Sequence, residues 1–517
     1  MKSISFSIRP DKRSQLPVRA LVFGDGGKAR GLIDWLIFKA NKEGVFNGRT
    51  LTVTDDVKGA REMPVRRGPA AAAADAQPQG PVCPVELLKK QDCLYTTLLH
   101  GKVQGGQLEE AAVINSIASV LNPRESWEAV MGAAMDAQVK FIFSDTTEAG
   151  MVFKSEQPFN TDVCPETFSG QLCAILFERF KAGAAGLWVI PCESVEDNGS
   201  RLRDLVLRHA AEQNCGDSFT AWLDSDCRFV NTCADRIVSG YPEPVDCQYW
   251  NQLGYEDFNM VCGQTMHELV LQGGEEILKE LPFDQVGLNV KTAADVTPFA
   301  LRRSRVIDGG MLALAPAGLL SSMENLCDVM ADKGLGSYGR SVIKDEVVPV
   351  LTTGADLPGA WVDEAIERLA DNDLKYALPE VLEHASLKVK EHLIPSLLDA
   401  RSRGVVPRKL CFALAAWTAL YQYAASSCDI EVRCSDGKSV SFKDDSALAE
   451  RMQQAWSHYQ KSEATARFTV SAVLGDTTLW GCDLSADMDV VSVTACLLHA
   501  IISDGVALTV QDLIEHV

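Results

Sequence analysis

The segment from Val18 to Asp56 constrains the fold more than any other part of the chain. Residues 18–23 form a short apolar run suited to a buried strand, and residues 24–31 follow as GDGGKARG. Residues 32–41 have the largely apolar pattern of a helix, and residues 51–54 predict a second strand. A strand, a glycine turn, a helix and a second strand form the opening unit of a doubly wound, mostly parallel sheet.

The glycine turn has the chemistry of a pyrophosphate site. Gly24 and Gly26 let backbone N–H groups approach a ligand closely, and the N-terminus of the following helix carries a partial positive charge. Ala29 takes the third place of the G-x-G-x-x-G/A spacing, where alanine is allowed. Asp55 would accept hydrogen bonds from an adenosine ribose and repel a 2′-phosphate, which favours NAD (NADH) over NADP. The alternative is a tight turn and a solvated carboxylate in a domain without a nucleotide site.

The composition indicates a protein that handles small molecules. The 517 residues carry 49 Lys+Arg against 70 Asp+Glu, a formal net charge of −21. No excess of basic residues exists to bind nucleic acid or an anionic membrane surface. We find neither an apolar run of about 18 residues nor a signal-peptide core. The 16 cysteines include no C-x-x-C pair and the 8 histidines have no metal-ligand spacing. We therefore expect a cytoplasmic protein with no metal site.

The pattern along the chain predicts two domains, residues 1–295 and 296–517. The first alternates strands and helices, which indicates a mostly parallel sheet covered on both faces. A low-complexity stretch, residues 61–80, interrupts it and is expected to form a surface loop, with a short alanine helix as the alternative. The second domain is mainly helical in period, with one hairpin predicted around Ser435-Asp436-Gly437. The strands expected in the first domain after residue 54 are 92–99, 112–114, 139–143 and 186–190.

Polar segments follow several of these strands. Residues 144–150 read SDTTEAG and residues 191–199 read PCESVEDNG. The carboxyl ends of parallel strands are where ligands of this fold bind, although each segment alone could be an ordinary connection. Residues 235–238, DRIV, pair opposite charges beside apolar residues, which is more often a structural ion pair than a catalytic one. His267 and Lys388, taken singly, carry no special signal.

Taken together, several segments resemble the mannitol dehydrogenase family, the polyol-specific long-chain dehydrogenases. The resemblance is greatest to the tagaturonate reductase (altronate oxidoreductase) branch. It rests on residues 16–35, LPVRALVFGDGGKARGLIDW, on SDTTEAG, PCESVEDNG and DRIV, on LGYED at 253–257, on the helix around Ile343–Val350, and on LKVKEHLIPSLL at 387–398. It runs in register over nearly the whole chain. It implies an NAD-binding Rossmann-type domain followed by a helical domain, with a sugar acid or polyol bound between them.

The resemblance also implies site residues. For the cofactor they are Gly24, Gly26, Arg30, Asp55, Thr146, Thr147, Glu148 and Asp235. For the substrate they are Ser194 and Arg368. In the mannitol-oxidising branch an oxyanion-binding asparagine occupies the position of Ser194, and the tagaturonate branch lacks it. Arg236, His267 and Lys388 also match the family, whereas its Asn-Pro after Arg368 is Asp371-Asn372 here. The resemblance says nothing about the oligomeric state.

The chain departs from the family where the chemistry should occur. The family's catalytic lysine, asparagine and histidine are Arg303, Asp308 and Met311 here. The lysine exchanges a proton with the substrate oxygen, and an arginine stays protonated above about pH 12. An ionised Asp308 would repel the oxyanion charge that an asparagine amide stabilises. Met311 offers only a weak thioether acceptor. Together, the three changes argue against the usual mechanism.

Three hypotheses remain open beside a two-domain protein without any nucleotide site. The first is a working NAD(H)-dependent reductase of a keto-uronate or related sugar acid, in which Arg303 binds the substrate carboxylate and Lys388 or His267 carries the proton. The second is a pseudoenzyme that binds nucleotide or sugar acid as a sensor, partner or assembly subunit. The third is an isomerase with Asp308 as its base, which the charge of Arg303 disfavours.

Overall fold

The computed structural model describes residues 2–12, 14–54, 84–103, 106–146, 150–159, 162–241, 248–351, 359–372, 375–425 and 427–515. The chain divides into two compact units, Met1–Ala300 and Leu301–Val517. The first contains the larger sheets, and the second is mainly helical with a two-stranded sheet. This confirms the predicted class: an N-terminal doubly wound domain followed by a mainly α-helical one.

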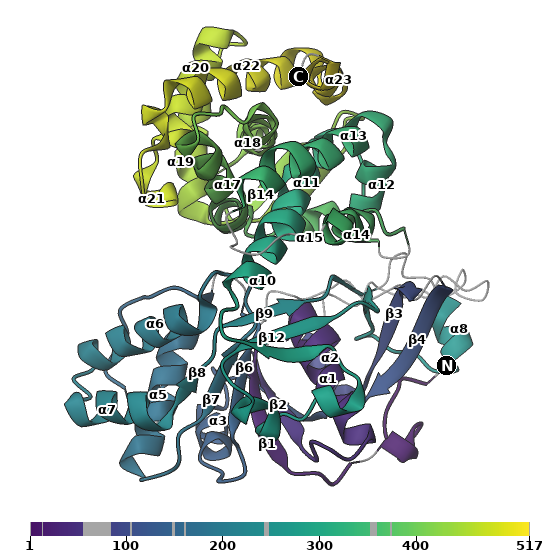
Figure 1. The fold of residues 1–517 in the computed structure, drawn as a ribbon, viewed down its shortest axis with the longest axis vertical. Coiled ribbons are helices and arrows are strands. Elements are labelled where there is room, and N and C mark those ends of the chain that lie inside the picture. The colour runs from purple at the N-terminus through teal and green to yellow at the C-terminus, as the bar shows by residue number, and fades with distance from the viewer. Residues whose placement is uncertain are drawn as a thin grey trace, which may run out of the picture. The chain divides into compact units, whose positions relative to one another are not determined.

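A six-stranded parallel sheet forms the centre of the first unit (Figure 1). Its order is β5-β2-β1-β6-β7-β8, and every neighbouring pair is parallel. The strands are β1 (Val18–Phe23), β2 (Arg49–Val53), β5 (Ile117–Leu121), β6 (Phe141–Ser144), β7 (Trp188–Pro191) and β8 (Arg228–Phe229). The chain builds outward from β1 to β5, returns to β6 and continues to the other side. The point where the order reverses therefore lies between β1 and β6.

Helices cover both faces of this sheet because successive side chains of a strand point to opposite faces. Ala20 and Val22 of β1 belong to one apolar cluster, together with Leu32 and Leu36 on the helical segment η2 (Ala29–Ile33) and α1 (Asp34–Lys42). Leu21 and Phe23 belong to the other cluster. It contains residues of α3 (Trp127–Ala134), α5 (Phe168–Lys181), α6 (Asn198–Glu212) and α7 (Asp217–Asp226). The continuous apolar run of β1 is thus explained by burial on both sides.

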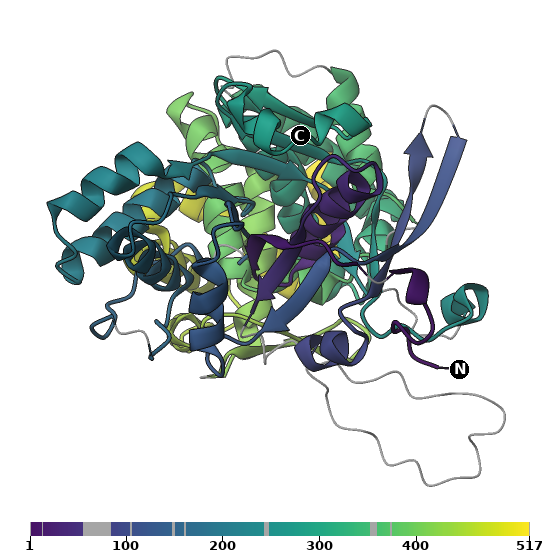
Figure 2. The same ribbon diagram turned by 90° about the horizontal axis from the view of Figure 1, so that it is seen from below.

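Two smaller sheets complete the first unit. One has the order β10-β11-β3-β4, and the other has the order β13-β12-β9. Their strands are β3 (Tyr95–Val103), β4 (Gly106–Ile114), β9 (Thr232–Asp235), β10 (Val238–Gly240), β11 (Val261–Gln264), β12 (Glu268–Gln272) and β13 (Val290–Ala293). The expectation that residues 92–99 and 112–114 belong to the main parallel sheet is wrong. β3 and β4 pair with each other in antiparallel fashion, and Figure 2 shows their hairpin extending away from the six-stranded sheet.

Helices dominate the second unit. Its central elements include η5 (Arg303–Asp308), α11 (Gly309–Leu320), α14 (Gly359–Leu369), η8 (Val389–Leu393), α18 (Arg408–Leu420) and α22 (Met488–Asp504). Helix α18 is buried along its whole length apart from Arg408. The predicted hairpin is confirmed: β14 (Asp429–Arg433) pairs with β15 (Ser439–Lys443), and Gly437 in the turn has a φ of 82°. Residues 61–80, the predicted loop, lie outside the described residues.

Candidate functional site

The polar segments predicted to follow the strands meet at the carboxyl edge of the six-stranded sheet. Phe23 at the end of β1 pairs with Ser144 at the end of β6, and Ser144 pairs with Pro191 at the end of β7. The glycine turn and the segments after β6 and β7 therefore stand side by side at the strand-order reversal. Doubly wound sheets bind their ligands in the crevice at this point.

The turn after β1 requires glycine for two different reasons. Gly24 has a φ of 94°, and a Cβ placed there would stand 2.4 Å from the carbonyl oxygen of Asp145. A Cβ at Gly26 would stand 2.6 Å from Oδ2 of Asp145. The same carboxylate accepts a 2.9 Å hydrogen bond from the N–H of Ala29. The strand, turn and helix predicted here are all present, and the aspartate after β6 is packed tightly against them.

Arg30 is buried and anchors this turn from inside. Its Nε donates to the carbonyl of Asp25 at 3.0 Å and its Nη1 donates to the carbonyl of Asn259 at 3.1 Å. The Tyr95 hydroxyl donates to the Arg30 carbonyl at 2.8 Å. Sequence reasoning missed Gly31, where a Cβ would stand 2.8 Å from the Val238 side chain. The close packing of helix on strand thus depends on Gly31 in addition to the small residue at position 29.

A buried carboxylate, Glu193, organises the ends of β6 and β7. Its Oε2 accepts a hydrogen bond from the Ser144 hydroxyl at 2.9 Å. Its Oε1 accepts from both the N–H and the hydroxyl of Thr146, at 2.9 and 2.7 Å. Burial raises the pKa of Glu193, while the hydrogen bonds from Thr146 oppose that rise. Thr146 is thereby placed at the crevice, whereas Thr147, Glu148 and Asp55 lie outside the described residues.

Lys28 links the glycine turn to the segment after β7. Its Nζ donates to the carbonyl of Cys192 at 3.2 Å and to the hydroxyl of Ser194. Asn198 holds this segment in place, because its Nδ2 donates to the carbonyl of Glu193 at 3.1 Å. Sequence reasoning singled out Ser194 but missed Lys28, Glu193 and Asn198. Their place in the polar segments that follow β1 and β7 was the available signal.

Asp235 is the last residue of β9, and His267 directly precedes β12 of the same sheet. Asp235 is buried opposite Glu268. The guanidinium of Arg236 lies 4.0 Å from the Trp35 ring centroid, and its Nη1 donates to the Gly31 carbonyl at 2.6 Å.

Both nitrogens of the His267 imidazole contact main-chain atoms. Its Nδ1 lies 3.1 Å from the Thr265 carbonyl oxygen, and its Nε2 accepts the N–H of Asn289 at 3.1 Å. Since a carbonyl only accepts, Nδ1 carries the proton. Burial, together with Arg236, lowers the pKa of His267 to about 4. This environment is that of a neutral structural histidine.

In the second unit, Arg303 and Asp308 form a mostly buried ion pair. Both lie on the π-helical turn η5, and Nη1 of Arg303 donates to Oδ1 of Asp308 at 2.6 Å. Oδ2 of Asp308 is buried and accepts no hydrogen bond from any described residue. Met311 follows on α11 and is buried. Of the three positions that differ from the family, two therefore carry opposite charges that pair with each other, and the third carries an apolar side chain.

The segment that carries Arg303 and Asp308 packs against elements that lie at or next to Arg368 and Lys388. Helix α14, which carries the buried Arg368, packs against η5, and so does η8, which directly follows Lys388. The Ser304 hydroxyl and Nδ1 of His392 are 2.8 Å apart across the contact between η5 and η8. Lys388 is half-buried, and its Nζ donates to the Val381 carbonyl at 2.9 Å. These charged candidates thus share one region of the second unit.

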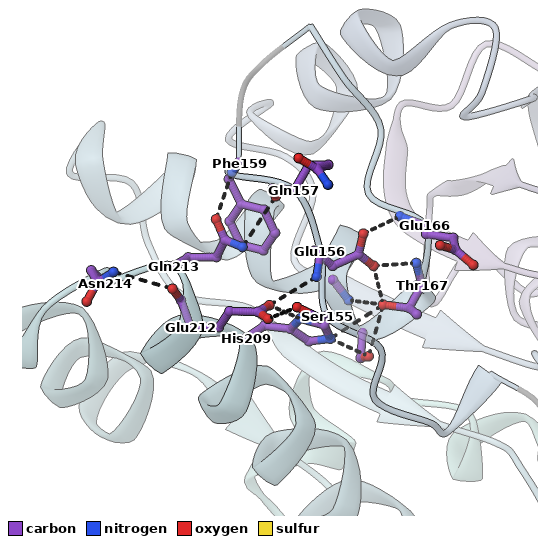
Figure 3. A network of polar contacts seen from close by, with 12 residues as sticks. Ser155, Glu156, Gln157, Phe159, Glu166, Thr167, His209, Glu212, Gln213 and Asn214 are labelled. Atoms are coloured by element: carbon purple, nitrogen blue, oxygen red, sulfur yellow. Dashed lines mark hydrogen bonds and ion pairs between the residues drawn. The ribbon is translucent and has the colours of Figure 1, made fainter.

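A second polar network in the first unit has the residue types of a serine–histidine–acid triad (Figure 3). The Ser169 hydroxyl lies 3.0 Å from Nε2 of His209, and Nδ1 of His209 lies 3.9 Å from Glu212. Ser169 and His209 are completely buried, and Ser169 also donates to the Val152 carbonyl at 3.2 Å. Glu156 accepts from the N–H of Thr167 at 2.7 Å. The network therefore anchors a loop on α5 and α6, and its Ser169–His209 pair is closed to solvent.

Within the described residues, no group of three or more histidine, cysteine or acidic side chains is placed to hold a metal ion. None of the helices in the described part of the chain is long and apolar enough to cross a membrane.

Comparisons with known proteins cover both units. Residues 18–283 match the Mannitol dehydrogenase Rossmann domain, and residues 295–502 match the Mannitol dehydrogenase C-terminal domain. A protein named altronate oxidoreductase from Halalkalibacterium halodurans is 30% identical over 511 residues, 98% of this chain and 95% of that protein. One of the same name from Bacillus subtilis is 30% identical over 480 residues, 92% of this chain and 91% of that protein.

Solved structures show the same fold at lower identity. Mannitol 2-dehydrogenase of Pseudomonas fluorescens, in a ternary complex with NAD and D-mannitol, superimposes with a TM-score of 0.81 at 19% identity, over 100% of both chains. A D-sorbitol dehydrogenase in substrate-free form gives 0.65 at 17% identity, over 99% of this chain and 100% of that one. The resemblance inferred from the sequence is confirmed by these matches and by those to the two domain families: the chain belongs to the mannitol dehydrogenase family.

Proposed function

We propose that this protein is an NAD(H)-dependent oxidoreductase whose substrate is a sugar acid of the altronate and tagaturonate class. The observation that carries the proposal is the turn at Gly24 and Gly26, which stands at the strand-order reversal of a parallel six-stranded sheet. The substrate class comes from the curated relatives, which are named altronate oxidoreductase and align with 92–98% of the chain.

The residues at the crevice fit a dinucleotide. Gly24 and Gly26 give the tight turn, the following helix begins at the crevice, and Thr146 is fixed beside it by Glu193. Arg30 would support the turn from the inside. Asp55, Thr147, Glu148 and Asp235 remain predicted cofactor residues. When bound, the cofactor supplies the hydride donor or acceptor.

The chain's own residues would then handle the substrate's charge and proton. Arg303 and Arg368 suit a carboxylate, because a guanidinium can hold one with two hydrogen bonds. Ser194 would offer a hydroxyl at the crevice. Of the two proton carriers considered, Lys388 is favoured, because both nitrogens of His267 are engaged by the main chain.

One observation favours a second candidate, a family member that binds nucleotide or sugar acid without turnover. Arg303 is neutralised by Asp308 at 2.6 Å. A guanidinium cannot exchange the substrate proton at neutral pH. A catalytically silent protein would tolerate such a pair at the family's catalytic positions.

Two measurements distinguish these candidates. The first is a fluorescence titration with NADH and with NADPH, in which saturable and preferential NADH binding is expected. The second is turnover of tagaturonate with NADH and of altronate with NAD. Turnover by the unmodified protein supports the enzyme. Binding without turnover supports the silent candidate, and absence of NADH binding by folded protein contradicts both NAD-using candidates.

The triple variant Arg303→Lys/Asp308→Asn/Met311→His restores the residue types of the family's catalytic positions. If the remaining site is intact, it should create or raise reductase activity. Failure of the folded triple variant would show that the pocket itself has diverged.

A further inference from the structure

The crevice at the strand-order reversal carries two carboxylates. Asp145 lies against the glycine turn, with Oδ2 2.9 Å from the N–H of Ala29. Glu193 lies one strand further along, bound to Thr146. A dinucleotide would bring two more negative charges to this edge through its pyrophosphate. Like charges in a partly buried crevice repel, so a positive charge nearby would favour binding there.

Lys28 brings a positive charge to this edge. It is the second residue after Gly26 and lies in the first turn of the helix. Its Nζ donates to the Cys192 carbonyl at 3.2 Å and to the Ser194 hydroxyl. Since β6 lies between β1 and β7 in the sheet, the Lys28 side chain crosses the end of β6. It thus follows the path that a dinucleotide takes from one half of such a sheet to the other.

Lys28, Asp145 and Glu193 all affect the pKa of the nearby Cys192 thiol. Burial is the main cause of the raised pKa of the Cys192 thiol; Glu193 and Asp145 raise it further, and Lys28 lowers it. Lys28 and Ser194 are only half-buried, so a ligand can reach them. An ammonium has three N–H donors. Lys28 can therefore keep both of its acceptors on the chain and still donate to a phosphate.

We propose that Lys28 contacts the pyrophosphate of the bound dinucleotide and offsets the negative charge of Asp145 and Glu193. This inference rests on the proposed NAD(H) binding. It assigns part of the charge compensation to the Lys28 side chain, in addition to the backbone amides of the turn.

The test compares Lys28→Met and Lys28→Gln with Lys28→Arg and with a matched control, Lys42→Met. Lys42 is exposed at the other end of the same helix, so its substitution removes the same charge far from the turn. The affinity for NADH and for ADP-ribose, which has the pyrophosphate but no nicotinamide, is measured by titration at low and high ionic strength. Circular dichroism of each variant checks folding.

Loss of the Lys28 charge is expected to weaken both ligands about tenfold at low ionic strength. The loss should shrink at high ionic strength, because salt screens the interaction. Lys28→Arg should keep most of the affinity, and Lys42→Met should change it by less than about twofold.

Three outcomes would overturn the inference. Unchanged affinity in both folded Lys28→Met and Lys28→Gln would remove Lys28 from the site while leaving the proposed function standing. Weakened NADH with unchanged ADP-ribose would move the contact away from the pyrophosphate. Failure of the unmodified protein to bind either ligand would overturn the proposed function and this inference together.

Discussion

Arg303 and Asp308 are five residues apart, and their side chains meet at 2.6 Å because they lie on one π-helical turn. A π-turn closes its hydrogen bonds between residues i and i+5, which brings such residues onto the same face. In a regular α-helix, residues three or four apart would face each other instead. The backbone irregularity and the two family-divergent side chains are therefore one structural feature.

Breaking this pair should destabilise the protein strongly. Arg303→Ala leaves the carboxylate of Asp308 without its charged partner in a mostly buried position, at an expected cost of about 3–5 kcal/mol in the free energy of unfolding. Replacing both residues together by Met and Leu should recover most of this loss. Urea unfolding of the full chain measures both effects.

The control for this prediction is Lys344→Ala. It breaks an ion pair exposed on both sides, in which Nζ of Lys344 lies 2.7 Å from Oδ1 of Asp363, and should cost less than about 1 kcal/mol. Equal stability of Arg303→Ala and the unmodified protein would show that the pair contributes nothing.

Gly24→Ala should be far more damaging than an alanine at another glycine of positive φ. At Gly24 the new Cβ would collide with the carbonyl oxygen of Asp145, at 2.4 Å, and the backbone can relieve this only by moving the turn. Gly44 has a φ of 73° with nothing within 4 Å of its Cβ position, so Gly44→Ala should cost about 1 kcal/mol. Melting temperature and NADH titration measure the difference. Similar behaviour of the two variants would contradict the close approach of Asp145.

The local pattern predicted what depends on neighbours in sequence. The apolar run of β1, the turn at Gly24 and the hairpin around Gly437 are all set within a few residues. The long-range partners could not be predicted in this way. Lys28 reaches Ser194 across 166 residues of chain. The apolar residues of β3 give no indication of whether their partner strand is parallel or antiparallel, so the sequence pattern alone assigns this strand to the wrong sheet.

The candidate site also combines features that the sequence predicts with contacts that it does not. The family resemblance identified Arg303 and Asp308 as divergent positions, and their chemistry followed from residue type alone. Their mutual contact did not, because the π-turn cannot be recognised from helical periodicity. Similarly, the histidine at 267 could be a proton carrier by type, and only its two main-chain partners show why that role suits it poorly.

Asp34→Asn should stabilise the protein at alkaline pH. Burial raises the pKa of Asp34 to about 7, although Thr50 donates a hydrogen bond to Oδ1 at 2.8 Å. The folded state therefore keeps the proton where the unfolded state has released it, and stability falls as pH rises from about 4 to about 7. An asparagine retains the acceptor without the charge.

The melting temperature at pH 5 and at pH 8 tests this. The variant's advantage in the free energy of unfolding should be on the order of a few kcal/mol at pH 8 and smaller at pH 5. Asp204→Asn, an exposed position on α6, is the control. An advantage that does not grow with pH would contradict the buried, proton-bearing state of Asp34.

His267 should give the opposite pH dependence. Its folded pKa of about 4 lies below the usual 6.5, because the ring is buried and Arg236 is close. As pH falls below about 6.5, His267 binds a proton in the unfolded state but not in the folded state, so stability should decline until about pH 4. His267→Gln should lose this part of the decline, whereas His458→Gln, which removes an exposed imidazole, should keep it. Unfolding by urea between pH 4 and pH 7 measures the slopes. Identical slopes for the unmodified protein and His267→Gln would mean that His267 is accessible to protons in the folded state, and would return it to the list of proton carriers.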